Sequence, residues 1–270
     1  MVRLTELPPI VRTPPEAGTH RVLLTLSYDG TQYAGWQMQK NAVSVQQRLE
    51  EALERLVGRP IRVTGASRTD AGVHALGQRA HFDTDSRIPP EKFPFALNTL
   101  LPPDIRVTDG RLVSGEFHAR FDAKAKQYTY RIYAAPHANA ILRNMTAHIP
   151  QRLDIPKMQK CLPVLLGTHD FAAFQAAGGT AKTTIRTIHA AQLKQEDALL
   201  TLTVRGNAFL YNMVRIIAGT MLDIGMGRCP EDAFERALQS KSRLDLGITA
   251  PASGLELTRV EYDLCSLVVE

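Results

Sequence analysis

The order of predicted strands and helices constrains the fold of this chain more than any other feature of its sequence. Strand segments show apolar and β-branched residues in alternation, whereas helical segments repeat apolar residues every three or four positions. In chain order the patterns predict strand 22–28, helix 45–56, strands 61–63 and 78–84, helix 93–100, strands 105–113 and 126–133, helix 157–166, strand 199–204 and helix 213–224. This order, roughly β-α-β-β in each half, predicts an α+β fold of two similar lobes, with mainly antiparallel sheets flanked by helices.

The helix over residues 45–56 has the clearest start and stop signals. Ser44 and Gln47 have the spacing of a capping box, in which the serine hydroxyl accepts a hydrogen bond from a backbone N–H of the first turn. Apolar residues then recur at helical spacing up to Gly58, and glycine commonly ends helices because it tolerates a left-handed backbone. The sequence therefore predicts one amphipathic helix between the first two strands.

Proline content separates a leader from the rest of the chain. Residues 8–18 read PPIVRTPPEAG, and prolines remove backbone donors and fix φ, so this segment cannot sustain a helix or a central strand. We therefore expect a disordered, proline-rich leader over residues 1–19, an N-terminal α+β lobe over 20–135 and a C-terminal α+β lobe over 136–270.

Composition and charge limit the class of protein. With 270 residues, 44% of them hydrophobic, the chain can bury one large core or two joined ones. It lacks the run of about 18 apolar residues that a membrane span needs and the apolar core of a signal peptide, so we expect a cytoplasmic protein without membrane contact. The three cysteines are scattered, which favours neither a disulfide framework nor a zinc site. The net charge of +5 suits a polyanionic partner but does not require one.

The segment GASRTDAGVHA at residues 65–75 combines the residue types of an active-site loop. Asp70 lies two residues after Arg68 and two before Gly72, between two predicted strands. Its carboxylate could be a nucleophile, a general base or a turn residue, since Asp followed closely by Gly is common in turns. Arg68 could hold the carboxylate ionised or bind an anionic substrate. The residues alone leave these roles open.

Basic and aromatic residues interleave in the sequence KAKQYTYR at residues 124–131. On a strand, Tyr128 and Tyr130 project from one face, where a ring can stack on an unpaired base while neighbouring lysines meet phosphates. The same pattern describes an amphipathic strand with half-buried tyrosines and solvated lysines. Taken by itself, the pattern favours this second interpretation.

A single arginine, Arg215, interrupts the apolar helix predicted at residues 213–224. In a buried helix an unpaired guanidinium would cost several kcal/mol, so a carboxylate or phosphate should face it, and Asp70 is the obvious candidate. Ala218 and Gly219 follow one turn later and predict close approach by the other lobe's backbone or by substrate. An equally good interpretation places Arg215 at the helix edge, where its side chain reaches water or a local acid.

These segments resemble the tRNA pseudouridine synthase A (TruA) family over nearly the whole chain after the leader. The resemblance is carried by residues 27–30 (SYDG) and 35–37 (GWQ), the Asp70 loop as far as Gln78, residues 117–133 and 168–174, the Arg215 helix, and Gly254 with Leu255. One departure is Ser67, because the family usually has glycine directly before the arginine. A backbone angle reserved for glycine therefore cannot be assumed at this position.

The resemblance implies a reaction and four residue roles. Asp70 would be the nucleophile, and Arg215 would pair with it. Tyr128 would pack on the target uracil, and Arg68 would fill the space left by a flipped base or contact flanking phosphates. The reaction would isomerise uridine to pseudouridine at positions 38 to 40 of the tRNA anticodon stem-loop, in a cleft between the lobes, without cofactor or metal. The resemblance also implies a homodimer that shares each tRNA.

Two other functions remain compatible with the residues. His81, Asp83 and Asp85 could share one strand face and, with the Asp70 loop, hold the divalent ion of a metal-dependent RNA phosphodiesterase or nuclease. The same three residues equally describe the wet face of an antiparallel strand. In a non-catalytic RNA-binding module, the basic and aromatic strand at residues 124–131 would bind RNA, and Asp70 would have no catalytic role. For His74, close to Asp70, we expect a role in structuring the loop.

Overall fold

The computed structural model describes residues 12–263 and has the predicted α+β fold class, with mainly antiparallel strands flanked by helices. The described chain divides into two compact units. The N-terminal unit comprises residues 12–124 and 257–263, and the C-terminal unit comprises Ala125–Glu256. Within residues 12–263, no helix has the length and apolar character needed to cross a lipid bilayer.

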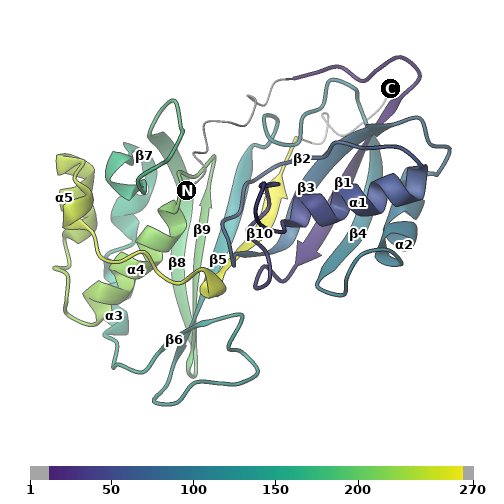
Figure 1. Cartoon of the computed structure of the whole chain (residues 1–270). Helices are drawn as coiled ribbons and strands as arrows, with labels where there is room; N and C mark the ends of the chain where they lie inside the picture. The colour runs from purple at the N-terminus through teal and green to yellow at the C-terminus, as the bar shows by residue number, and fades with distance from the viewer. Residues whose placement is uncertain (1–11, 264–270) are drawn as a thin grey trace. The chain divides into compact units, whose positions relative to one another are not determined.

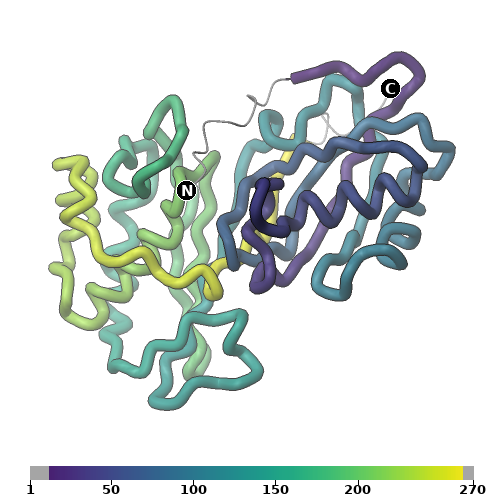
Figure 2. Tube along the Cα trace, in the orientation of Figure 1, coloured from purple at the N-terminus to yellow at the C-terminus, as the bar shows by residue number. Residues whose placement is uncertain are grey.

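The N-terminal unit is a sheet with its α-helices on one face (Figure 1). In this sheet β1 lies between β4 and β3 and pairs antiparallel with both, and β3 also pairs with β2 and β10. Figure 2 shows the yellow end of the chain beside the blue strands of this unit, although it comes last in the sequence. The elements are β1 (His20–Tyr28), α1 (Val45–Val57), β2 (Thr64–Gly65), β3 (His74–Thr84), the 3₁₀ turn η2 (Pro90–Lys92), α2 (Phe93–Asn98), β4 (Ile105–Val113) and β10 (Leu255–Glu261), whose first two residues belong to the other unit.

Helix α1 confirms the predicted start and stop signals. The Ser44 hydroxyl accepts a hydrogen bond from the Gln47 N–H at 3.2 Å, and Gly58 ends the helix with a left-handed φ of 79°. The Gln47 side chain donates to Glu51 one turn later, at 2.9 Å. The cap therefore depends on the serine oxygen, which satisfies one of the free N–H groups of the first turn.

The prediction of a strand at residues 61–63 is wrong, because this part of the chain pairs with β3 only at Thr64–Gly65. The backbone of Val63 is bonded to α1 instead. Its N–H donates to Glu50 Oε1 at 3.0 Å, and its carbonyl accepts from the Gln46 side chain at 3.1 Å. These bonds to helix side chains occupy the backbone groups that a strand would use in a ladder.

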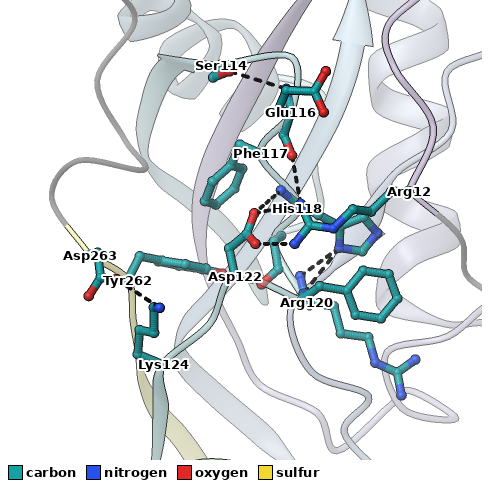
Figure 3. Close-up of polar contacts among 12 residues, drawn as sticks. Arg12, Ser114, Glu116, Phe117, His118, Arg120, Asp122, Lys124, Tyr262 and Asp263 are labelled. Carbon is teal, nitrogen blue, oxygen red and sulfur yellow. Dashed lines mark hydrogen bonds and ion pairs between the residues drawn. The ribbon is translucent and has the colours of Figure 1, made fainter.

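The part of the expected leader that falls on residues 1–11 lies outside the described residues, whereas residues 12–19 are described and precede β1. Arg12 forms an ion pair with Asp122 and donates to the Glu116 carbonyl at 2.9 Å (Figure 3). The Thr13 carbonyl accepts a hydrogen bond from the buried Arg21 guanidinium at 2.9 Å. This short segment is therefore bonded to the N-terminal unit.

The C-terminal unit has four antiparallel strands in the order β5-β9-β8-β7, with β6 parallel to β5. Helices α3, α4 and α5 gather on one side of β8 and β9 (Figure 1), and α4 is buried almost all round. The elements are β5 (Ala125–Ala134), β6 (Ala147–Ile149), α3 (Ile155–Lys160), η3 (Pro163–Leu165), β7 (Gly167–Asp170), η4 (Ala172–Phe174), β8 (Ile185–Glu196), β9 (Leu199–Gly206), α4 (Met213–Gly225), α5 (Ala233–Ser240), η5 (Arg243–Asp245) and η6 (Ala252–Gly254).

The prediction of a single helix at residues 157–166 is wrong. The chain forms α3, which ends at Lys160, and then the separate 3₁₀ turn η3, which starts at Pro163. A proline has no N–H for the helical ladder, and its ring clashes with the preceding turn, so it sits where a new turn begins. Strands β6, β7, β8 and β10 and helix α5 were not predicted from the sequence.

Candidate active site

The loop that carries Arg68 and Asp70 connects β2 to β3 in the N-terminal unit. Thr69, between them, is buried and fixes the loop at two points. Its carbonyl accepts from the Trp36 N–H at 3.1 Å, and its hydroxyl lies 2.7 Å from the Tyr28 hydroxyl. Asp70 is half-buried and Arg68 is exposed. Because the middle residue is held from both sides, the side chains of Arg68 and Asp70 start from a defined backbone.

Two glycines let neighbouring chain segments approach this loop closely. Gly35 has a φ of +88°, and a Cβ at that position would lie 2.4 Å from the Thr69 carbonyl oxygen. A Cβ at Gly30 would lie 2.0 Å from the Val73 carbonyl oxygen. Contacts this short cannot be accommodated, so any side chain here would displace the loop. The motif segments at residues 27–37 therefore act as the support of the Asp70 loop.

The buried side chain of Gln78 holds the residue next to Arg68. Its amide nitrogen donates to the Ser67 carbonyl at 2.7 Å, and its amide oxygen accepts from the Ser67 N–H at 3.2 Å. Ser67 stands where the TruA family usually has glycine, yet it is not among the residues with positive φ. The serine is therefore accommodated without the left-handed backbone that favours glycine.

His74 is a structural residue of the loop, as predicted. Its ring is buried, and Nδ1 accepts a hydrogen bond from the Gly30 N–H at 3.1 Å. The same nitrogen lies 3.1 Å from a carboxylate oxygen of Asp29. The Gly30 hydrogen bond ties the start of β3 to the turn after β1.

Arg68 is an exposed residue of the Asp70 loop. Partial burial and the nearby positive charge of Arg120 both lower the pKa of Arg68. Among the residues that the structure describes, no carboxylate forms an ion pair with Arg68. Arg68 and Asp70 are therefore not paired with each other. Of the two roles open for Arg68, this arrangement favours contact with an anionic substrate. The sequence analysis gave Arg120 no role, although its segment FHARF at residues 117–121 is part of the resemblance to the family.

In the C-terminal unit, Tyr128 and Tyr130 lie on β5, and both are more buried than an amphipathic strand predicts. Tyr128 is 6% exposed and packs edge-on against Phe209, with ring centroids 5.1 Å apart. Tyr130 is fully buried, and its hydroxyl donates to the Pro251 carbonyl at 2.9 Å. Burial raises the pKa of Tyr130. The bonded hydroxyl of Tyr130 gives it a structural role.

Arg215 lies in the first turn of α4, next to the tyrosine strand of the same unit. Its Nε donates to the Ala250 carbonyl at 2.8 Å, and one Nη donates to the Asn212 side-chain oxygen at 2.9 Å. The Ala250 and Pro251 carbonyls, adjacent in the chain, thus accept from Arg215 and Tyr130 respectively. The segment at residues 250–251 was not identified from the sequence; its only signal was the neighbouring Gly254 and Leu255.

The prediction for Gly219 is wrong about what approaches it. A Cβ at Gly219 would lie 1.9 Å from the Ile248 carbonyl oxygen and 3.0 Å from the Ala250 nitrogen. The close approach therefore comes from a segment of the same unit. This is the segment that also accepts the Arg215 hydrogen bond, so the glycine allows it to lie against α4.

Arg68 and Asp70 thus belong to the N-terminal unit, and Tyr128 and Arg215 to the C-terminal unit. The structure brings Arg68 and Asp70 together on one loop, and it places Arg215 beside the strand of Tyr128 through Tyr130 and residues 250–251. The pairing of Asp70 with Arg215 stays a prediction.

The residues suspected of metal binding have other partners. The His81 Nδ1 accepts from the Ala119 N–H at 3.2 Å, and burial, with the Arg21 charge next, lowers the pKa of His81 to about 3. Asp83 pairs with the Arg21 guanidinium at 2.7 Å, and Asp85 pairs with Arg59 at 3.0 Å. Across residues 12–263, no group of three or more His, Cys, Asp or Glu side chains is arranged to hold a metal ion.

Comparison with known proteins identifies the family. Residues 25–122 and 163–263 match the family described as tRNA pseudouridine synthase. A protein of Ruminiclostridium cellulolyticum named tRNA pseudouridine synthase A is 49% identical over 243 residues, which cover 90% of this chain and 99% of that protein. Proteins with the same name from Acetivibrio thermocellus and Shouchella clausii are 47% and 48% identical, covering 89% and 90% of this chain and 99% and 93% of theirs. This chain belongs to the tRNA pseudouridine synthase family.

Proposed function

We propose that this protein isomerises uridine to pseudouridine at positions 38 to 40 of the tRNA anticodon stem-loop, with Asp70 as the nucleophile. One observation carries the proposal: Asp70 is half-buried in a loop whose neighbouring residue Thr69 is held by Trp36 and Tyr28. A nucleophile that forms a covalent bond needs such a fixed position relative to its target atom. The named relatives support the reaction, and the resemblance to TruA supports the positions in tRNA.

The bonds and protons that change in the reaction show what the protein must supply. The bond between uracil N1 and ribose C1′ breaks, a bond between C5 and C1′ forms, and one proton leaves C5 while N1 gains one. No electrons are exchanged with another molecule, so the protein needs a nucleophile, a means of holding the freed uracil and a path for one proton. Attack of Asp70 on C1′, attack on C6 and elimination to a glycal all meet this balance.

The other three site residues have distinct roles in this proposal. Arg215 keeps Asp70 ionised, since a nearby positive charge lowers the pKa of a carboxyl group. Tyr128 packs on the uracil after the base is extruded from the RNA stack. Arg68 fills the vacated space or contacts the flanking phosphates, in keeping with its exposed guanidinium and its lack of an ion pair among the described residues.

We also propose that the enzyme acts in the cytoplasm as a homodimer that shares each tRNA, without cofactor or metal. The net charge of +5 suits the polyanionic substrate, and the TruA resemblance supports the dimer. Sedimentation of the purified protein, alone and with tRNA, measures the oligomeric state. A monomer at both conditions would contradict the dimer without affecting the proposed chemistry.

Release of tritium from an unmodified tRNA transcript with 5-tritiated uridine tests the reaction directly. Wild type should release tritium in buffer with EDTA, and Asp70→Asn should release none while binding tRNA. Asp85→Asn is the matched control, because it removes a carboxylate of the same unit that pairs with Arg59 at 3.0 Å. It should react like wild type.

The alternatives predict other results. A metal-dependent nuclease would lose activity with EDTA and would cleave the transcript. A non-catalytic RNA-binding module would release no tritium in any variant, and Asp70→Asn would function as well as wild type. Either outcome would remove Asp70 from the chemical centre.

A further inference from the structure

An irregular stretch of the C-terminal unit, residues 247–250, lies against helix α4 and is held there by two helix side chains (Figure 1). The Thr220 hydroxyl accepts a hydrogen bond from the Gly247 N–H at 3.0 Å, and the Asp223 carboxylate accepts one from the Ile248 N–H at 3.0 Å. Both side chains are buried. A stretch without helix or strand bonds of its own takes its position from such partners, because its backbone groups must be satisfied elsewhere.

Ala250, at the end of this stretch, is bonded twice to Arg215. Its N–H donates to the Arg215 carbonyl at 3.0 Å, and its carbonyl accepts from the Arg215 Nε at 2.8 Å. A further bond, from an Arg215 Nη to the Asn212 side chain at 2.9 Å, is made to the residue just before the helix. Ala250 is therefore a fixed point outside the start of α4 that sets the direction of the guanidinium group.

The stretch links distant positions of the same helix. Eight residues separate Arg215 from Asp223, which corresponds to about 12 Å along the helix axis. The chain covers this distance in the opposite direction, from the Asp223 bond at Ile248 to the Arg215 bonds at Ala250. Gly219 lies between them, and a Cβ there would lie 1.9 Å from the Ile248 carbonyl oxygen. The stretch is thus packed directly on the helix, so its bonds near Asp223 determine where Ala250 lies.

The Thr220 hydroxyl has a defined orientation for its part in this arrangement. It donates its single hydrogen to the Ile216 carbonyl one turn earlier, at 2.8 Å. Its oxygen is left to act as the acceptor for the Gly247 N–H. The hydroxyl is therefore a directed contact to the stretch rather than only a filler of the core.

We propose that Thr220 and Asp223 are positioning residues for Arg215. They hold the residues before Ala250 against α4, and Ala250 fixes the direction in which the guanidinium points. The inference rests on the proposed function, in which Arg215 keeps Asp70 ionised. Thr220 and Asp223 contact neither RNA nor reacting atoms in this proposal, so they act on the reaction only through Arg215.

Two pairs of variants separate the hydrogen bonds from bulk and charge. Thr220→Val keeps the shape of the side chain and removes the hydroxyl, whereas Thr220→Ser keeps the hydroxyl. Asp223→Leu removes the acceptor, whereas Asp223→Asn keeps an acceptor oxygen and removes the charge that lies 3.8 Å from Arg228. Thr84→Val is the matched control, since the buried Thr84 hydroxyl accepts from the Ser86 N–H at 3.1 Å in the other unit.

Exchange of the Arg215 Nε–H with solvent, followed by NMR, measures the position of this side chain without reference to activity. In Thr220→Val and Asp223→Leu, exchange should be faster by about three- to tenfold, because the bond to the Ala250 carbonyl opens more often. Thr220→Ser, Asp223→Asn and Thr84→Val should keep the wild-type exchange rate. An unchanged rate in Thr220→Val would overturn the proposal.

The pH profile of tritium release measures the consequence for the reaction. In Thr220→Val, kcat should fall by up to about 100-fold, with KM for tRNA near the wild-type value, because a small displacement of a positioned group is costly. Its acid limb should move to higher pH, as expected for Arg215→Gln. In the double variant Thr220→Val/Arg215→Gln, kcat should equal that of Arg215→Gln alone, because Thr220 acts through Arg215.

A purely structural role of Thr220 gives a different result. Thr220→Val would then lower kcat by the same factor in the wild-type and Arg215→Gln backgrounds, and its acid limb would stay in place. Either observation would overturn the positioning role while tritium release by wild type still supports the proposed function. If wild type releases no tritium, the proposed function fails, and the exchange of the Arg215 Nε–H still shows whether Thr220 and Asp223 hold this side chain.

Discussion

Gln78 encloses the backbone of Ser67, with its amide nitrogen 2.7 Å from the Ser67 carbonyl oxygen and its amide oxygen 3.2 Å from the Ser67 nitrogen. Gln78→Met keeps the length of the side chain and removes both hydrogen bonds. We expect a loss of about 1 to 3 kcal/mol in the free energy of unfolding, because buried backbone groups lose their partner. We also expect a lower kcat, because the loop that carries Asp70 loses an anchor.

Gln47→Met is the matched control, since the Gln47 side chain donates to Glu51 within α1 and makes no other side-chain hydrogen bond among residues 12–263. Urea unfolding and tritium release measure both variants. Equal stability and equal kcat in the two would show that the enclosure of Ser67 does not support the loop.

Gly35→Ala should be more damaging than Gly58→Ala, although both glycines have positive φ. Gly58 has φ +79°, and a Cβ added there would meet open space, so only the backbone conformation is penalised, by about 1 to 2 kcal/mol. At Gly35 the new Cβ would also lie 2.4 Å from the Thr69 carbonyl oxygen. Gly35→Ala should therefore lower stability further and abolish most tritium release, as measured by thermal unfolding and the tRNA assay. Similar losses of stability in both variants, with full activity, would contradict the contact.

Stability should fall on acidification because two buried histidines stay neutral in the folded protein. Burial, with Arg12 next, lowers the pKa of His118 to about 4, and burial, with Arg21 next, lowers that of His81 to about 3. The negative charge of Asp122 opposes both shifts. Below about pH 6.5 the unfolded chain binds protons that the folded chain does not, so the free energy of unfolding decreases toward pH 4 by up to about 1.4 kcal/mol per pH unit for each histidine.

His118→Asn tests this pH dependence. An asparagine oxygen can accept the hydrogen bonds that the His118 Nδ1 accepts from the Arg120 and Phe121 N–H groups, at 3.2 Å and 3.3 Å, but does not titrate in this range. Urea unfolding between pH 4 and 7 should show a shallower acid slope in His118→Asn than in wild type. The exposed His137→Asn should keep the wild-type slope. Equal slopes in all three proteins would show that His118 is not held neutral.

Arg215→Gln should move the acid limb of the pH profile of kcat to higher pH, because the proposed pairing would favour the ionised form of Asp70. The substitution also removes the hydrogen bond to the Ala250 carbonyl, so folding is checked by thermal unfolding. Asn212→Gly is the control, since glycine keeps the left-handed φ of 60° and removes only the amide that accepts from Arg215. An acid limb that stays in place in Arg215→Gln would argue against the pairing with Asp70.

Local sequence patterns correctly predicted the helices and strands that are specified by neighbouring residues, such as a helix cap or an alternation of apolar residues. The Ser44 cap and Gly58 stop define α1 to within one residue, the extended pattern of residues 105–113 defines β4, and alternation defines β5 to within one residue at each end. The Asp70 loop was predicted from the sequence because its candidate residues, Arg68 and Asp70, are nearly consecutive in the chain. Local patterns failed at residues 61–63, where β propensity was outweighed by hydrogen bonds from Glu50 and Gln46.

By itself, the sequence determined the α+β class, the first helix, the family resemblance and the loop that holds Arg68 and Asp70. Only the tertiary structure decided that the Ile248 carbonyl occupies the space beside Gly219 and that residues 250–251 hold Arg215 and Tyr130. Spacing along the chain reports contacts within a few residues, because helix and strand periodicities are local. Contacts between residues tens of positions apart depend on how strands pair and loops are anchored, and these follow from packing of the whole unit.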